Sequence, residues 1–258
     1  MSILDKFSLE NKKAVVIGAS RGLGRRMALA LAGAGADVVV SSRSLKALRE
    51  VAKKITQFGR ESYAFRCDVS NISEIEKLHQ SVIEKFLKVD ILINAIGTTI
   101  RKPSIEITEE DWEKVAGVNL KAMLFACKIF GKSMIEHGGG KIINIASLQS
   151  VIALPRRTLY NITKTGVLGL TRSLAIEWGK YKVNVNAIAP GYFLTEMTKP
   201  LFENKEWREK LLQGIPLGKV GAPEDLDGAV IFLSSQASDY VTGEVVFVDG
   251  GFMSGENL

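Results

Sequence analysis

The sequence predicts one α/β domain over residues 1–258, built on a doubly wound parallel sheet of about seven strands with helices on both faces. Short apolar runs rich in β-branched residues alternate with longer segments of helical spacing, and no break in composition interrupts the alternation. Runs such as Val-Val-Val at 38–40 and Ile-Leu-Ile at 91–93 are continuously apolar, which is typical of parallel strands buried on both faces.

Each expected strand is a short run of this kind. The first, 14–17, leads directly into a glycine-rich turn, and the second, 37–41, consists mainly of valine and serine. The pattern predicts the remaining strands at 62–66, 91–94, 141–146, 183–188 and 245–248.

The expected helices fill the intervals between these strands, at 23–34, 44–58, 73–87, 109–136, 157–179 and 223–236. The segment at about 193–221 breaks this rhythm, because it contains Pro200, Pro216 and an amphipathic stretch at 207–213. It lies between two expected strands. We interpret it as a helical lid over a site, with a plain structural connector as the alternative.

The composition excludes several classes of protein. A hydrophobic content of 46% with 24% charged residues is ordinary for a soluble globular protein. No apolar run reaches membrane-spanning length and the first residues lack a signal-peptide pattern, so we expect a cytoplasmic protein without membrane contact. The net charge is +6, but basic residues are interspersed with acidic ones, which argues against nucleic acid. Two cysteines and two histidines favour neither a disulfide framework nor a metal site.

A glycine cluster follows the first expected strand at once. Gly18, Gly22 and Gly24 have the spacing Gly-x-x-x-Gly-x-Gly, and helical spacing begins at Leu23. Small residues let the backbone approach a phosphate, and the amides at a helix amino end attract an anion. The turn therefore predicts a dinucleotide site, with Gly22 and Gly24 nearest the pyrophosphate.

A second motif combines a phenol, an ammonium group and a hydroxyl. Tyr160 and Lys164 are four residues apart in an expected helix, so they share one face, and Ser147 directly follows the strand at 141–146. A nearby cation lowers the pKa of a phenol from about 10, which makes the phenol a better acid–base group. We expect Tyr160 to exchange the proton, Lys164 to lower its pKa, and Ser147 to hold a carbonyl or alcohol oxygen.

Together, and in this order, these motifs resemble the short-chain dehydrogenase/reductase family. The resemblance covers nearly the whole chain and rests on Gly18-Ala19-Ser20-Arg21-Gly22-Leu23-Gly24, Asn94-Ala95-Ile96-Gly97, Asn119, Ser147, Tyr160, Lys164 and Pro190-Gly191. It implies a Rossmann-like fold and an enzyme that transfers a hydride between a nicotinamide and a carbonyl or alcohol. It also implies that Asn119 links Lys164 through water to a proton relay, beside Ser147 and Tyr160 in the catalytic set.

The resemblance assigns cofactor contacts along the chain. They are Gly18, Ser20, Arg21, Gly22, Leu23 and Gly24 in the glycine turn, Asp68 and Val69 at the adenine, Asn94, Gly97, Tyr160 and Lys164 at the nicotinamide ribose, and Pro190, Gly191 and Thr195 at the carboxamide. Two positions depart from the family pattern. Ile17 stands where the family usually has threonine, and Ile96 is bulkier than the usual alanine.

The end of the second expected strand predicts the choice of cofactor. An NAD site generally has an acidic residue there, which binds the ribose hydroxyls, whereas an arginine accommodates the 2′-phosphate of NADP. This chain has Ser41-Ser42-Arg43-Ser44 without a carboxylate, and Arg21 lies in the glycine turn. We therefore expect Ser42, Arg43 and Arg21 to bind NADP(H). The alternative is that both arginines are plain surface residues.

The substrate is predicted from finer similarities within the family. Arg101-Lys102-Pro103 and the segment 190–199 are more similar to gluconate 5-dehydrogenases than to 3-oxoacyl-carrier-protein reductases. One of the two basic residues, with arginine better suited, would pair with a sugar-acid carboxylate, and Ser147, Gln149 and Tyr160 would contact substrate oxygens. We expect an NADP(H)-dependent enzyme that interconverts 5-keto-gluconate and gluconate, or a related sugar acid.

Two alternatives stay open at this point. One is a 3-oxoacyl-carrier-protein reductase, which shares the whole framework. The other is a dinucleotide-sensing protein that has lost turnover, against which the intact Ser147, Tyr160 and Lys164 argue. The resemblance also implies a homotetramer with contacts through the helices near 109–136 and 157–179 and through the C-terminal strand.

Overall fold

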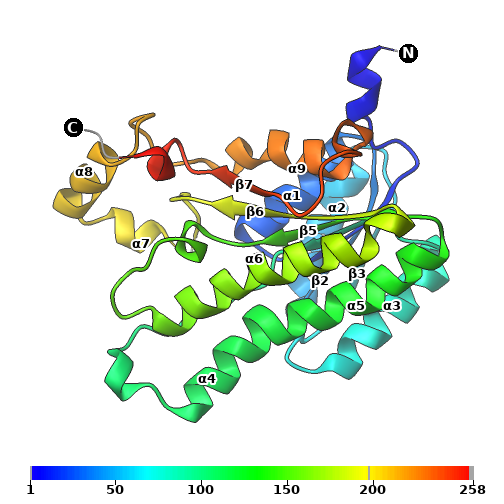
Figure 1. Ribbon diagram of the computed structural model, residues 1–258. Helices are drawn as coiled ribbons and strands as arrows, with labels where there is room; N and C mark the ends of the chain where they lie inside the picture. Colours follow the sequence, from blue (N-terminus) through cyan, green and yellow to red (C-terminus); the bar gives the residue numbers. More distant parts are fainter. Residues whose placement is uncertain (1, 197, 256–258) are drawn as a thin grey trace.

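The computed structural model describes residues 2–196 and 198–255 (Figure 1). One seven-stranded sheet has the order β3-β2-β1-β4-β5-β6-β7, and each pair of neighbouring strands runs parallel. The bounds are β1 Lys13–Ile17, β2 Asp37–Ser42, β3 Ser62–Arg66, β4 Ile91–Asn94, β5 Gly140–Ile145, β6 Val183–Pro190 and β7 Val245–Val248. The predicted fold class is confirmed. The strand order reverses between β1 and β4, which is where an open parallel sheet of this kind opens a crevice for ligands.

Helices cover both faces of the sheet (Figure 1). Alternate residues of β1 point to opposite faces. Val15 and Ile17 join the core under α3 (Ile72–Phe86), α5 (Ala122–Glu136) and α6 (Thr158–Trp178). Ala14 and Val16 join the core under α1 (Gly22–Gly33), α2 (Leu45–Thr56) and α9 (Asp227–Ser234). In the described residues, no helix is both long enough and apolar enough to cross a membrane.

One predicted helix is interrupted. The segment expected as one helix at 109–136 consists of α4 (Glu109–Ala116), a π-helical turn, η3 (Gly117–Lys121), and α5. Such π turns occur frequently at functional sites, because the wider turn redirects side chains. Here the wide turn contains Asn119, whose side chain is fully buried.

The expected lid forms an arm between β6 and α9 (Figure 1, yellow to orange). It contains α7 (Lys199–Phe202) and α8 (Lys205–Gln213), and a bridge between Phe193 and Gly221 closes its base. The ring of Trp207 packs edge-on against Tyr192, with 6.1 Å between ring centroids. Residue 197, within this predicted lid, lies outside the described residues.

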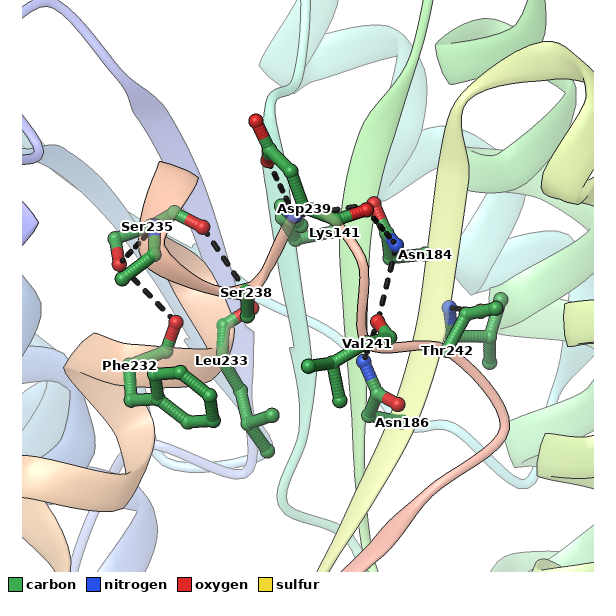
Figure 2. A network of polar contacts seen from close by, with 12 residues as sticks. Lys141, Asn184, Asn186, Phe232, Leu233, Ser235, Ser238, Asp239, Val241 and Thr242 are labelled. Carbon is green, nitrogen blue, oxygen red and sulfur yellow. Dashed lines mark hydrogen bonds and ion pairs between the residues drawn. The ribbon is translucent and has the colours of Figure 1, made fainter. Parts of the chain in front are cut away.

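A polar network anchors the segment before β7 at the amino ends of β5 and β6 (Figure 2). The Lys141 ammonium contacts a carboxylate oxygen of Asp239 at 2.8 Å and the Asn184 amide oxygen at 3.0 Å. The side-chain amides of Asn184 and Asn186 both donate to the Val241 carbonyl, at 3.0 Å and 2.9 Å. The network therefore fixes the segment that leads into the edge strand β7 to the next two strands of the sheet, β6 and β5.

Candidate active site

A single large cleft lies where the strands end. Its walls come from the turn after β1 and from the loops that follow β2, β3, β4, β5 and β6. Its volume is about 2330 Å³. Pockets for one drug-sized ligand measure roughly 300–1,000 Å³. The cleft therefore has room for a dinucleotide and a second molecule beside it.

The glycine turn is shaped by backbone contact. Gly18 has φ +92°, and a Cβ there would lie 2.2 Å from the carbonyl oxygen of Ala95. A Cβ on Gly24 would lie 2.3 Å from the carbonyl oxygen of Gly18. Only glycine fits at these two positions. The turn thus packs against the loop after β4 and presents the amino end of α1, which begins at Gly22, to the cleft. This cradle fits the pyrophosphate of a dinucleotide.

Two arginines line the cleft near this turn, Arg21 within the turn and Arg43 directly after β2. Arg21 and Arg43 line the cleft and are exposed, and no carboxylate of the described residues forms an ion pair with either. Asp68 accepts hydrogen bonds from the hydroxyl and amide of Ser70, which lower its pKa, and the charge of Arg43 lowers it further. Both guanidinium groups therefore remain available to a phosphate.

The predicted catalytic trio meets in the cleft. Ser147 follows β5 and caps a short 3-10 turn, η4 (Leu148–Ser150), where its Oγ accepts the Gln149 amide at 3.1 Å. Tyr160 lies in the first turn of α6, in hydrogen-bonding contact with Ser147. Lys164 is one turn further along, with its Nζ 5.7 Å from the centroid of the Tyr160 ring. The hydroxyl, the phenol and the ammonium group are brought together.

The electrostatics of Tyr160 differ from our expectation. Burial raises the pKa of its phenol, and the hydrogen bond to Ser147 and the charge of Arg157 oppose that rise. Lys164 is not among the groups that lower it. The Lys164 ammonium itself donates to the Ile145 carbonyl at 2.6 Å, and burial lowers its own pKa to about 8. The prediction that Lys164 acidifies Tyr160 is not supported by this arrangement.

The lowered pKa of Lys164 has a measurable consequence for stability. Its folded-state pKa, about 8, lies below the ordinary 10.5, so between these values the unfolded chain binds more protons. Stability must then rise with pH over that window, by on the order of 3 kcal/mol in total. In urea unfolding of the ligand-free protein, we expect the stability of the wild type relative to that of Lys164→Met to increase between pH 7.5 and 10. A difference that stays constant with pH would contradict the assignment.

Asn119 lies behind the cleft wall. Its Oδ1 accepts the Thr98 amide at 2.7 Å, and its Nδ2 donates to the Thr98 carbonyl at 2.9 Å and to the Thr163 hydroxyl at 3.0 Å. A Cβ added at Gly97 would lie 3.5 Å from Lys164 Nζ and 3.8 Å from Asn119 Oδ1. Asn119 therefore stands close to Lys164 but does not line the cleft, and its direct role is to hold the loop after β4.

Asn94 is not where the prediction placed it. Its amide nitrogen donates to the Asn144 amide oxygen at 2.9 Å and to the Cys127 sulfur at 3.2 Å, inside the core. It ties β4 to β5 and does not line the cleft, so its assignment as a cofactor contact is wrong for the side chain. The other predicted cofactor residues do line the cleft: Gly18, Ser20, Arg21, Gly22, Leu23, Gly24, Ser42, Arg43, Asp68, Val69, Gly97, Tyr160, Lys164, Pro190, Gly191 and Thr195.

At the substrate end the structure separates Arg101 from Lys102. Lys102 is paired with Asp111 at 2.5 Å, a contact that contributes most to lowering the pKa of that carboxyl to about 2. Arg101 lines the cleft, as does Gln149, whose buried Oε1 has no hydrogen-bond partner among the described residues. Arginine, with its rigid donor fork, is thus the residue left for a carboxylate.

Sequence reasoning missed Arg157. It directly precedes α6 and lines the cleft half-buried. The pair Arg156-Arg157 reads as an ordinary basic loop. The signal that was available is its position, three residues before Tyr160 at the start of the helix expected at 157–179.

Comparison with known proteins agrees with this geometry. A family model described as "Enoyl-(Acyl carrier protein) reductase" matches residues 18–253, which is most of the chain. The chain belongs to the short-chain dehydrogenase/reductase family. It is therefore a member of an oxidoreductase family.

Similar members of the short-chain dehydrogenase/reductase family carry sugar-acid names. The 2-dehydro-3-deoxy-D-gluconate 5-dehydrogenase of Dickeya dadantii is 41% identical over 253 residues, which cover 98% of this chain and 99% of that protein. The gluconate 5-dehydrogenase of Gluconobacter oxydans is 38% identical, covering 97% and 98%. The crystal structure of a gluconate 5-dehydrogenase from Burkholderia cenocepacia, in complex with NADP and tartrate, has a TM-score of 0.94 at 34% identity and covers 98% of this chain and all of that one.

Proposed function

We propose that this protein is an NADP(H)-dependent oxidoreductase that interconverts the carbonyl and the alcohol at carbon 5 of a six-carbon sugar acid. The names of its relatives place the reacting position at carbon 5 of a gluconate skeleton. The observation that carries the proposal is the cleft itself, which joins the trio Ser147, Tyr160 and Lys164 to a glycine cradle on one side and to Arg101 on the other.

The residues at the substrate end suit a hydroxylated anion. Arg101 offers a charge for a carboxylate, and the buried Oε1 of Gln149 needs a hydrogen-bond donor, which a sugar hydroxyl would supply. The relative from Burkholderia cenocepacia binds tartrate, a small hydroxylated acid. A long apolar acyl chain would leave these polar groups without partners, which weighs against a 3-oxoacyl substrate.

Ser147, Tyr160 and Lys164 have separate roles in the reduction of the carbonyl. Ser147 donates a hydrogen bond to the carbonyl oxygen and polarises it, while Tyr160, kept protonated by its raised pKa, delivers the proton to that oxygen. NADPH, when bound, supplies the hydride. Lys164, one turn further along α6, would donate a hydrogen bond to the nicotinamide ribose. In the oxidation direction Tyr160 takes the proton instead.

The preference for NADP(H) over NAD(H) rests on Arg21 and Arg43. A charge-assisted hydrogen bond to the 2′-phosphate is worth roughly 1.5–3 kcal/mol, so Arg43→Ala should weaken NADPH binding about 10- to 100-fold. NADH binding should change less than about threefold. Arg49→Ala, which removes an exposed arginine of α2 outside the cleft, is the matched control. Equilibrium titration by nucleotide fluorescence measures both, and equal weakening for the two nucleotides would refute the phosphate clamp.

A substrate panel tests the proposed function. The oxidation of NADPH, followed by absorbance, is measured with 5-keto-D-gluconate and with an acetoacetyl thioester, and the reduction of NADP with 2-dehydro-3-deoxy-D-gluconate. We expect turnover of at least one sugar acid with a specificity far above that for the thioester. Preference for the thioester would favour the 3-oxoacyl-carrier-protein reductase. Binding of NADPH without turnover of any of the three would favour the dinucleotide sensor.

Several parts of this proposal come from the sequence alone. We include a homotetramer, a cytoplasmic location, and the arm at about 193–221 as a substrate lid. Phe202 and Trp207, which line the cleft from this arm, support its role as a cover.

A further inference from the structure

Arg157 is a half-buried cation on the wall of the cleft, beside the reacting group. It directly precedes α6, and its Nη1 lies 3.5 Å from the Thr99 hydroxyl on the loop after β4. Thr99 precedes Arg101 by two residues on that loop. Arg157 is the N-cap residue of α6, and Tyr160 lies in the first turn of that helix.

The charge of Arg157 has no counter-ion. No carboxylate of the described residues pairs with Arg157 or with Arg101, although the chain pairs other cations nearby, such as Lys102 with Asp111 and Arg26 with Asp227. Burial and the charge of Arg101 both lower the pKa of the Arg157 guanidinium, and only the phenols of Tyr160 and Tyr192 oppose this. Two like charges on one cleft wall, one of them half-buried, are unfavourable in the free protein. A bound anion relieves that cost.

The spacing suits a sugar acid held at both ends. Arg157 at the N-cap of α6 and Tyr160 in its first turn both line the cleft, and the charge of Arg157 acts on the Tyr160 phenol. Carbons 1 and 5 of an extended six-carbon acid are joined by four bonds of about 1.5 Å, which span on the order of 5 Å. When carbon 5 lies at Tyr160, carbon 1 therefore reaches the neighbourhood of Arg157.

We propose that Arg157 binds the substrate carboxylate jointly with Arg101 and is a specificity-determining residue of the enzyme. This inference rests on the proposed function and deepens it. Its role is the recognition of charge: Arg157 selects acids over neutral sugars of the same length, and it fixes the distance from the carboxylate to the reacting carbon. The neighbouring Arg156 also lines the cleft, but its side chain is exposed, whereas that of Arg157 is half-buried.

The test compares an acid with its neutral counterpart. Arg157→Gln is assayed with 5-keto-D-gluconate and with the uncharged methyl amide of the same compound, with NADPH. We expect kcat/KM for the acid to fall about 30-fold or more, mainly through KM, and kcat/KM for the amide to change less than about threefold. Arg157→Lys keeps the positive charge but lacks the paired donors of a guanidinium, so it should recover part of the lost kcat/KM for the acid.

The remaining outcomes separate the two proposals. An unchanged kcat/KM for the acid, or an equal loss for acid and amide while NADPH still binds, would overturn the role of Arg157. If Arg157→Gln does not fold, Arg157→Lys tests the proposal in its place. A variant that is less active on both the acid and the amide but keeps the wild-type selectivity between them would also overturn the role of Arg157. If the wild type reduces no sugar acid, the proposed function fails. Melting curves with tartrate then compare wild type and Arg157→Gln, and equal shifts reject the anion site.

Discussion

Replacing Tyr160 by phenylalanine is expected to lower kcat by about 10²- to 10⁴-fold, the usual contribution of a positioned general acid. The ring still fills its place at the start of α6, and Ser147 keeps its bond from the Gln149 amide, so the fold and NADPH binding should survive. Stopped-flow reduction of 5-keto-D-gluconate at saturating NADPH measures the chemical step directly, free of product release.

The matched control is Tyr192→Phe. Tyr192 also lines the cleft, its pKa is also raised by burial, and it also faces the charge of Arg157. Its ring packs against Trp207 and Phe252, and, unlike Tyr160, it makes no hydrogen bond with Ser147 in the described part of the chain. We expect its loss of hydroxyl to change kcat less than about tenfold. Near-normal turnover by Tyr160→Phe, or an equal loss in both variants, would remove Tyr160 from the proton transfer.

The second large effect is expected at the glycine turn. In Gly18→Ala the new methyl group would meet the Ala95 carbonyl oxygen at 2.2 Å, in a backbone conformation that side chains rarely adopt. The turn and the loop after β4 must move apart, which should cost about 3 kcal/mol of stability or more and weaken NADPH binding at least about tenfold. Chemical denaturation and nucleotide fluorescence measure the two effects.

Gly228→Ala serves as the control for this substitution. Gly228 lies in α9, where an added Cβ meets nothing within 4 Å, so alanine should leave the nucleotide affinity intact and slightly favour the helix. A Gly18→Ala protein with wild-type stability and affinity would show that the turn can relax, and the steric account of the cradle would be wrong.

The sheet could be predicted from the sequence because its strands are short apolar runs bounded by turns. Predicted and observed strand bounds differ by two residues at most, as at β6, where the strand extends to Pro190. The break at η3 could not be predicted in the same way. Residues 109–136 have continuous helical spacing, and the wide turn depends on the contact between Asn119 and Thr98, which are distant in sequence. Periodicity reports local geometry and carries no information about such a contact.

The parts of the site that could be predicted are those in which the spacing of residues along the chain alone determines how they lie. Tyr160 and Lys164 had to share a helix face, and the glycines had to form a tight turn. Asn94 was placed wrongly because a motif gives the position in the chain but not the side of the sheet that a side chain enters. The burial of Lys164 and its bond to the Ile145 carbonyl are likewise not visible in the sequence.

The two ends of the parallel strands have different roles, the carboxyl rim in ligand binding and the amino rim in holding strands together. The carboxyl rim holds the cleft, whereas the polar network of Lys141, Asn184 and Asn186 occupies the amino rim (Figure 2). An engineer who wants a more heat-resistant biocatalyst can therefore work at that amino rim, strengthening the attachment of the last strand, and leave the chemistry of the opposite rim undisturbed.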